Sequence, residues 1–350
     1  MQTNYSSASR SVSSPLAMFT KVAKVKLAAA GFAAFAPFIA VSAHAQGADV
    51  ESYPNGPIRV IVGIGAGSNT DALGRLASTY LSERLGQPVV VQNKPGAGGT
   101  LGAEEVAKAK PDGYTLLWAS SSIPMFPHLR ENLRFDPIND LTGVGGVALG
   151  GLVMLTRPNA PWKSLAELIK YGKENPPRSI TYASAGVGSN AHLFSEILAQ
   201  SAGLELLHVP YKGSSAAVTD VMGGQIDFVF DGPSTAVGQI AAGNVLPLGF
   251  STKERSSFLP DVPSVAEAGV DGYNQRTWLS FFAPAGTDKR IIEKLSQKIQ
   301  EFVTDDKFRA DLAKLSHEPY KLSADELTAM VAVEGKEWAK RLATLGIQKQ

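Results

Sequence analysis

The chain has 350 residues, of which 44% are hydrophobic and 19% charged, and this composition is that of a globular protein rather than a disordered or fibrous one. Its 33 Lys and Arg nearly balance its 32 Asp and Glu, so no basic surplus indicates a nucleic-acid partner. Cysteine is absent, which excludes disulfides, thiolate metal sites, a cysteine nucleophile and a lipid-modified N-terminal cysteine.

The histidines argue against a zinc enzyme. Five are present, at positions 44, 128, 192, 208 and 317, and no two have the i,i+4 spacing of paired ligands on one helix face. No metal and no cofactor is expected.

The first 45 residues are typical of an export signal. They contain no Asp or Glu, and lysines at positions 21, 24 and 26 precede an apolar run over residues 27–42. This run of about 16 residues is shorter than the roughly 20 that span a bilayer. Ala43-His44-Ala45 then forms a small-x-small cleavage site. We predict that residues 1–45 are removed and that a soluble periplasmic protein remains; an uncleaved membrane anchor is the alternative.

Strands and helices alternate from residue 58 onward. The apolar, β-branched run 58–64 predicts a buried strand, and strands at 88–92 and 114–119 follow, with helices after the first two. Further strands are predicted at 152–156, 181–183, 206–209, 228–230 and 247–251, separated by helices at 165–174, 190–202, 216–222 and 235–242. A strand at 278–283 and two C-terminal helices complete the pattern, the second helix over about 324–345. The alternation predicts an α/β protein with mainly parallel sheets.

The length suits two domains. We expect residues 46–149 plus 277–350 to form one α/β lobe and residues 150–276 the other, with the chain crossing between them more than once. That wiring predicts a ligand cleft between the lobes and permits hinge closure.

Four turns between a strand and a helix have the same chemistry. They consist mainly of Gly, Ser, Asn, Asp or Thr and lie at residues 65–71, 184–190, 213–215 and 231–234. Such turns expose backbone N–H groups at the positive end of a helix, where a carboxylate or phosphate binds well. The alternative is that these residues only cap their helices.

Motifs for catalysis and nucleotide binding are weak. The glycines at 65 and 67 are followed by Thr70 where the dinucleotide fingerprint needs glycine, and no phosphate-binding loop with Gly-Lys-Ser/Thr is present. Ser189 and His192 are three residues apart and could form a hydrolase site with Asp231. Because their surroundings lack the Gly-x-Ser-x-Gly pattern, an exported serine hydrolase is the alternative function and not the main one.

Several motifs together resemble a known family. They are Asn93-Lys94-Pro95-Gly96-Ala97-Gly98-Gly99, Pro111-Asp112-Gly113-Tyr114-Thr115-Leu116 and, as the most specific, His208-Val209-Pro210-Tyr211-Lys212-Gly213. The chain resembles, over about residues 53–350, the periplasmic solute receptors of tripartite tricarboxylate transporters, the Bug or TctC type.

This resemblance implies a two-lobed Venus-flytrap fold that binds a carboxylate, held largely by backbone amides and ordered water from loops of both lobes. Where the family has Pro-Phe-x-Pro-Gly-Gly-x-x-Asp, residues 63–71 lack both prolines and the aromatic residue, and Ser68 and Asn69 add side-chain donors. The ligand-binding residues we expect are Ile64, Gly67, Ser68, Asn69, Asp71, Ser120, Ser121, Ser122, Ser184, Gly188, Ser189, His192, Tyr211, Asp231 and Trp278.

Two of these residues have alternative roles. Asp231 either contacts a ligand ammonium or hydroxyl, or bridges to amides of the other lobe, or caps the helix that follows it. Trp278 packs either against the ligand or in the core.

The expected function is therefore that of a monomeric, non-enzymatic receptor. It would capture a di- or tricarboxylate, an acidic amino acid or an aromatic acid and deliver it to membrane transporter subunits. The small number of positive side chains near the turns argues mildly against a fully ionised tricarboxylate. A receptor that feeds a signalling partner is a third possibility.

Overall fold

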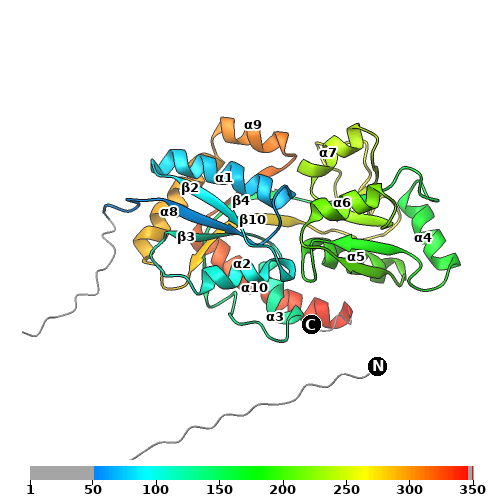
Figure 1. Ribbon diagram of the computed structural model, residues 1–350, viewed down its shortest axis with the longest axis horizontal. Helices are drawn as coiled ribbons and strands as arrows, with labels where there is room; N and C mark the ends of the chain where they lie inside the picture. The colour runs from blue at the N-terminus through cyan, green and yellow to red at the C-terminus, as the bar shows by residue number, and fades with distance from the viewer. Residues whose placement is uncertain (1–50, 346–348, 350) are drawn as a thin grey trace, which may run out of the picture. The chain divides into compact units, whose positions relative to one another are not determined.

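The computed structural model describes residues 51–345 and Lys349 (Figure 1). The predicted signal peptide, residues 1–45, lies outside the described residues. Within the part that is described, no helix combines the length and the apolar character needed to cross a membrane.

The first sheet has six strands in the order β11-β4-β10-β3-β1-β2. Their bounds are Ile58–Val62 (β1), Val89–Asn93 (β2), Thr115–Ser120 (β3), Leu141–Gly150 (β4), Thr277–Pro284 (β10) and Glu318–Leu322 (β11). β1 runs parallel to β2 and β3, whereas β10 runs antiparallel to both β3 and β4 and β11 antiparallel to β4.

The second sheet has five strands in the order β7-β6-β8-β5-β9. They are Val153–Thr156 (β5), Thr181–Ser184 (β6), Leu207–Pro210 (β7), Phe228–Asp231 (β8) and Leu246–Phe250 (β9). β6 is parallel to β7 and β8, and β5 is antiparallel to β8 and β9. The second sheet is therefore built entirely from residues between β4 and β10.

The prediction of mainly parallel sheets is wrong, because each sheet is mixed. β4 leads the chain out of the first sheet and β10 brings it back, and Gly150 at the end of β4 pairs with Thr277 at the start of β10. Two strands that leave and enter through the same passage must run in opposite directions. The antiparallel pairing of β10 with β4 and of β9 with β5 thus follows from the chain crossing twice between the sheets.

Ten α-helices cover the two sheets. They are Asn69–Leu85 (α1), Thr100–Ala107 (α2), Phe126–Leu129 (α3), Leu165–Glu174 (α4), Asn190–Ala202 (α5), Ser214–Met222 (α6), Pro233–Ala241 (α7), Lys289–Val303 (α8), Asp306–Lys314 (α9) and Ala324–Leu345 (α10), counted over the residues described above. The bounds of α4, α5 and α10 match the predicted ones. The sequence patterns did not indicate α3, α9, β4 or β11.

Strand β4 escaped prediction because of its glycines, which are depleted in strands. Gly145 faces α8, where an added Cβ would lie 3.0 Å from Ile299, and Gly143 faces α10, where it would lie 2.9 Å from Leu327. These glycines let the two helices pack closely on the strand, which is a tertiary requirement with no local pattern.

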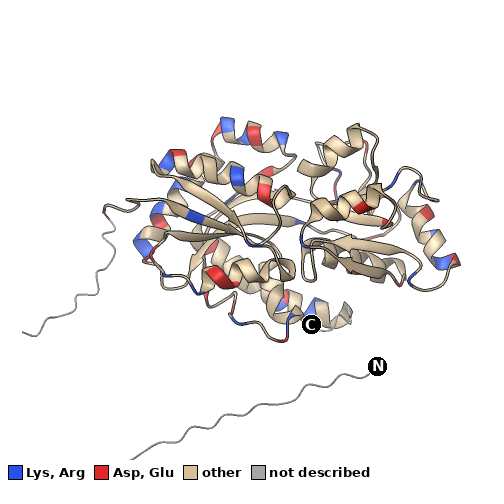
Figure 2. Ribbon diagram, in the orientation of Figure 1, with Lys and Arg blue, Asp and Glu red and all other residues tan. Residues whose placement is uncertain are grey.

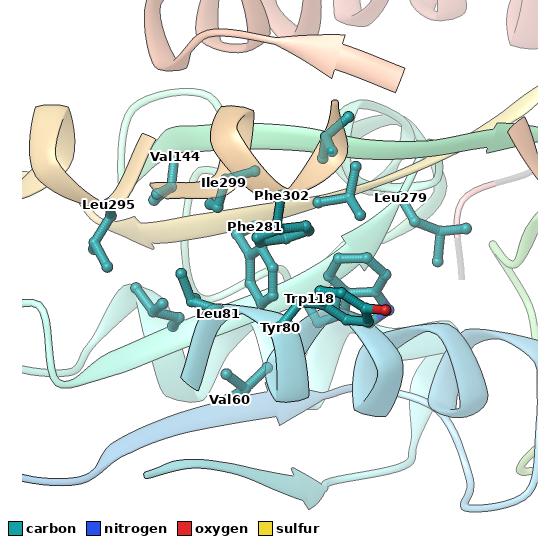
Figure 3. Packing of buried hydrophobic residues seen from close by; sticks show 14 of the residues in the cluster. Val60, Tyr80, Leu81, Trp118, Val144, Leu279, Phe281, Leu295, Ile299 and Phe302 are labelled. Carbon is teal, nitrogen blue, oxygen red and sulfur yellow. The ribbon is translucent and has the colours of Figure 1, made fainter. Parts of the chain in front are cut away.

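The core of the first sheet lies between α1, α8 and the strands (Figure 3). Trp118 of β3 and Phe281 of β10 pack with their ring centroids 4.8 Å apart, and Trp118 Nε1 donates to the carbonyl of Thr70 at 2.9 Å. This bond ties the core to the first turn of α1.

A smaller apolar cluster connects elements of the two sheets. Met125 and Leu129 lie near α3, Leu193 belongs to α5, and Leu342 belongs to α10. Gln200 of α5 also donates to the carbonyl of Thr344 at 2.9 Å. The C-terminal helix therefore begins on the first sheet and ends against a helix of the second.

Candidate functional site

A cavity of about 70 Å³ lies where the two sheets face each other. Segments of both sheets line it: Ile64, Ser68, Asn69, Thr70, Gly98, Ser120, Ser122, Leu152, Ala185, Ser189, Asn190, Ala191, Ser214, Phe230, Asp231, Gly232, Thr277 and Leu279.

Four helices begin at this cavity. α1 starts after Ser68, whose hydroxyl accepts from the N–H of Asp71 at 3.3 Å, and α5 starts after Ser189, whose hydroxyl accepts from the N–H of His192 at 3.4 Å. α6 begins at Ser214 and α7 directly after Gly232. The positive ends of four helix dipoles thus surround one small space, which favours an anion.

The cavity obtains this positive potential without basic side chains. Among the described residues that line it, none is Lys, Arg or His, and Asp231 is the one that can ionise. Figure 2 shows charged residues on α4, α8 and α9, whereas α7 at the cavity carries none. Backbone dipoles, hydroxyl groups and the buried Asp231 carboxyl therefore determine the electrostatics of the site.

Asp231 is almost fully buried at the end of β8. Burial raises the pKa of its carboxyl, although hydrogen bonds from Thr235, Ser214 and the Gly232 N–H lower it. The bond from the Thr235 hydroxyl holds the first turn of α7. Of the predicted roles for Asp231, the structure shows the contact with its own helix.

The raised pKa gives a pH dependence of stability with a definite sign. Between its ordinary value and its raised value, the Asp231 carboxyl is more protonated in the folded chain than in the unfolded one. The free energy of unfolding therefore falls as pH rises through that interval. Asp231→Asn keeps the shape but cannot ionise, so we expect its stability relative to the wild type to increase as the pH rises above the ordinary carboxyl pKa. Urea unfolding of both proteins over a series of pH values measures this difference in stability, and a difference that does not change with pH would contradict the prediction.

Hydrogen bonds join the two sides of the cavity. Ser121 donates to Asn190 Oδ1 at 3.2 Å, and Asn190 Nδ2 donates to Thr277 Oγ1 at 2.8 Å. The N–H and hydroxyl of Ser234 donate to Asn69 Oδ1 at 3.3 and 2.5 Å. These bonds connect residues of the first sheet's segments to α5 and α7, so the site is closed.

Glycines allow the two sides to approach this closely. A Cβ on Gly98 would lie 2.1 Å from the carbonyl oxygen of Val187, and a Cβ on Gly232 would lie 2.1 Å from Cγ of Asn69. Since real Cβ atoms do not make such contacts, any side chain at either position would push the two sides apart.

Of the residues expected to bind ligand, seven line the cavity: Ile64, Ser68, Asn69, Ser120, Ser122, Ser189 and Asp231. The other eight lie outside its lining: Gly67, Asp71, Ser121, Ser184, Gly188, His192, Tyr211 and Trp278. That the seven contact a ligand stays a prediction.

Several of the other residues support the loops around the cavity. Asp71 accepts from the Gly67 N–H at 3.0 Å and from Asn93 Nδ2 at 2.8 Å, which shapes the first loop. The Ser184 hydroxyl bonds to His208 Nε2 at 2.7 Å. Tyr211 donates its hydroxyl to Asp220 at 2.5 Å.

Trp278 is buried in the core beside Phe282, and its Nε1 donates to the Glu334 carboxylate at 3.1 Å. Of its two predicted roles, the structure shows packing in the core.

Some lining residues were not predicted. Asn190, Ser214 and Gly232 stand within the turns noted in the sequence, so the polar-turn signal could have found them. Thr277 and Leu279 come from β10, whose hydrophobic pattern indicates a buried strand and carries no sign of a site. Gly98 has a left-handed backbone (φ 67°) within the glycine-rich run 96–99.

The geometry around Ser189 does not resemble a hydrolase site. The ring of His192 accepts from the Gly188 N–H through Nδ1 at 3.3 Å and stacks on His208 with centroids 4.3 Å apart. Burial lowers the pKa of His192 to about 3, with His208 and Arg130 adding to the effect. This imidazole is buried in a ring stack, and the Ser189 hydroxyl caps α5.

The chain is similar to the proteins of a known family. The family described as "Tripartite tricarboxylate transporter family receptor" matches residues 73–347. Protein BugT of Bordetella pertussis is 34% identical over 304 residues, covering 86% of this chain and 93% of BugT.

Solved structures are also similar. The periplasmic binding protein BugD is 33% identical with a TM-score of 0.81, covering 85% of this chain and 100% of BugD. A Rhodopseudomonas palustris protein solved with adipate is 31% identical, also with a TM-score of 0.81 and with coverage of 85% and 100%.

Proposed function

Because this chain belongs to the tripartite tricarboxylate transporter receptor family, we propose that it is a periplasmic receptor that captures a small carboxylate and presents it to a membrane transporter. The observation that carries this proposal is the cavity between the two sheets, at which four helices begin and whose described lining includes no basic side chain. The adipate bound to the R. palustris relative supports the ligand class.

The mechanism follows from the two-sided construction of the site. A carboxylate docks on backbone N–H groups and hydroxyls at the starts of α1, α5, α6 and α7, and its presence favours the closed form. Because a ligand shifts a conformational equilibrium only by its differential affinity, contacts from both sides are what couple binding to closure. The closed face then distinguishes loaded from empty receptor for the membrane partner.

The charge of the site limits which classes of carboxylate it can bind. A buried carboxylate needs hydrogen bonds or a counter-charge, and this cavity offers helix dipoles and hydroxyls beside a buried acid. One or two carboxylates fit this supply better than three, so mono- and dicarboxylates or acidic amino acids are favoured over citrate-like acids.

We further propose that the protein works as a monomer and that residues 46–149 plus 277–350 and residues 150–276 form its two lobes. The sheet membership of the strands supports that division. We propose no enzymatic activity, because the Ser189 hydroxyl caps α5 and the His192 ring is held by the Gly188 N–H and stacked on His208.

A thermal-shift screen of residues 46–350 against mono-, di- and tricarboxylates, amino acids and aromatic acids tests the proposal. A ligand at 100 times its dissociation constant should stabilise the protein by about 2.7 kcal/mol. Stabilisation confined to carboxylates, without turnover, is the expected result. No shift with any acid, or consumption of an ester or amide, would count against a receptor. Uptake in cells lacking the gene separates a transport partner from a signalling one.

A further inference from the structure

Asn69 connects three parts of the molecule through its side-chain amide. It is the first residue of α1, is buried, and lines the cavity. Its Oδ1 accepts both the N–H and the hydroxyl of Ser234 from α7, whereas its Nδ2 lies 3.5 Å from Nε2 of His317. His317 is not among the residues that line the cavity.

The turn after α9 places His317 beneath Asn69. Ser316, just before it, has a left-handed backbone (φ 58°), which is unfavourable for a residue with a Cβ and persists where surrounding structure demands it. The imidazole is 1% exposed and lies against Gly150, where an added Cβ would be 2.9 Å from Cδ2 of the ring. Gly150, at the end of β4, therefore leaves the space that this ring occupies.

The hydrogen bonds of His317 determine its tautomer. Its Nδ1 lies 2.7 Å from the carbonyl oxygen of Leu315, and a carbonyl can only accept, so Nδ1 carries the proton. Burial lowers the pKa of His317 to about 4, which keeps the ring neutral near pH 7. Nε2 therefore presents a lone pair and accepts from Asn69 Nδ2.

This lone pair selects one orientation of the Asn69 amide. With Nδ2 directed to His317, Oδ1 faces the two donors of Ser234. In the flipped amide, the NH₂ group would meet the backbone N–H of Ser234 and the carbonyl oxygen would meet the lone pair of Nε2, and both of these contacts would be repulsive.

We propose that His317 is a positioning residue for ligand capture, which orients the Asn69 amide so that its carbonyl oxygen receives Ser234 when the site closes. The inference rests on the proposed function. His317 and Asn69 both belong to segments of the first sheet, so we expect their bond not to depend on the position of α7. The amide is therefore preorganised, and closing requires no search for its correct rotamer.

The first test needs no ligand. In ligand-free residues 46–350, ¹⁵N NMR of the histidine rings should show His317 as the Nδ1–H tautomer, with Nε2 unprotonated and hydrogen-bonded. In Asn69→Ala the tautomer should persist and the Nε2 resonance should move to the position of a free lone pair. An Nε2–H tautomer in the wild type would overturn the proposal, whether or not any ligand is known.

The second test is a double-mutant cycle on binding affinity, with adipate as the first probe. If adipate does not bind, the probe is the acid that gives the largest thermal shift in the screen. His317→Phe keeps an aromatic ring and removes the acceptor, and it should weaken binding about tenfold, the worth of one hydrogen bond. His317→Gln, whose Oε1 can accept from Asn69, should recover part of the loss.

The cycle separates positioning from a structural role. His317→Phe combined with Asn69→Ala should weaken binding no more than Asn69→Ala alone, because the amide through which His317 acts is then absent. His128→Phe is the matched control. His128 Nε2 lies 3.0 Å from the carbonyl oxygen of Gly335 and does not contact α7, so the substitution should leave affinity unchanged. Additive losses, or a loss that persists without Asn69, would show that His317 does not act through the amide.

Discussion

Gly232→Ala should weaken ligand binding by at least about 100-fold while leaving the ligand-free protein close to wild-type stability. In the closed site the new methyl group would lie 2.1 Å from Cγ and 2.2 Å from Cβ of Asn69, so α1 and α7 cannot come together. A 100-fold loss corresponds to about 2.7 kcal/mol, which is modest for a clash of this depth. Isothermal titration with the acid found in the screen measures the loss.

The position makes this substitution selective for closure. Gly232 has φ −73°, which every residue adopts, so alanine introduces no backbone strain there. Gly232 is the N-cap of α7 and makes no side-chain capping bond, so alanine at this position removes none and costs at most about 1 kcal/mol. In an open form Asn69 has moved away and the methyl group meets no neighbour from α1.

Gly238→Ala is the matched control, because it lies on the same helix and an added Cβ there meets nothing within 4 Å. It should leave affinity unchanged and stabilise the protein by about 0.5–1 kcal/mol, as expected for glycine to alanine inside a helix. Wild-type affinity in Gly232→Ala would mean that the ligand-bound form is not the closed arrangement described here.

The second large effect is on stability. Phe281→Ala should lower the free energy of unfolding by about 3–5 kcal/mol, because Phe281 is fully buried in the middle of β10 and packs on Trp118. β10 pairs with both β3 and β4, so a void beside it loosens the centre of the first sheet. Urea unfolding followed by circular dichroism measures the change.

Val333→Ala is the control for this experiment, since the Val333 side chain is 56% exposed on α10 and its truncation should cost less than about 0.5 kcal/mol. Equal effects of the two substitutions would contradict the assignment of Phe281 to the core. Because Trp118 also anchors the first turn of α1 through Thr70, Phe281→Ala should weaken ligand binding as well, though less than Gly232→Ala.

The two predictions distinguish two uses of small and large side chains in one protein. Phe281 and its neighbours fill the core of the first sheet. Gly98 and Gly232, in contrast, leave room for the two sides of the cavity to meet. A receptor needs both, because the docking surfaces must keep their shape while the distance between them changes.

Local patterns in the sequence determined much of this protein. Hydrophobic periodicity predicted α4, α5 and α10 with their observed bounds, since one buried face per helix is a local requirement. Polar turns after strands predicted that α1, α5, α6 and α7 follow them, because orphan N–H groups need nearby acceptors, although α6 and α7 begin two residues earlier than predicted. The family motifs around Tyr211 indicated the receptor fold.

Other features were decided by tertiary structure. The glycines of β4 lower its strand propensity, and its formation depends on α8 and α10 packing against it. The antiparallel direction of β10 follows from the double crossing of the chain. The sequence alone could not identify the hydrogen-bond partners of Trp278 and His192. In the structure these partners are Glu334 and Gly188, which do not line the cavity.

The contacts of Asn69 are the clearest example of a feature that tertiary structure decided. Asn69 bonds to Ser234 across 165 residues and to His317 across 248 residues of chain. A local pattern reports whether a residue is buried, begins a helix or forms a turn, because those properties depend on its near neighbours. Which surfaces meet across the cavity depends instead on how two sheets are placed by crossing strands, and that information exists only in the folded chain.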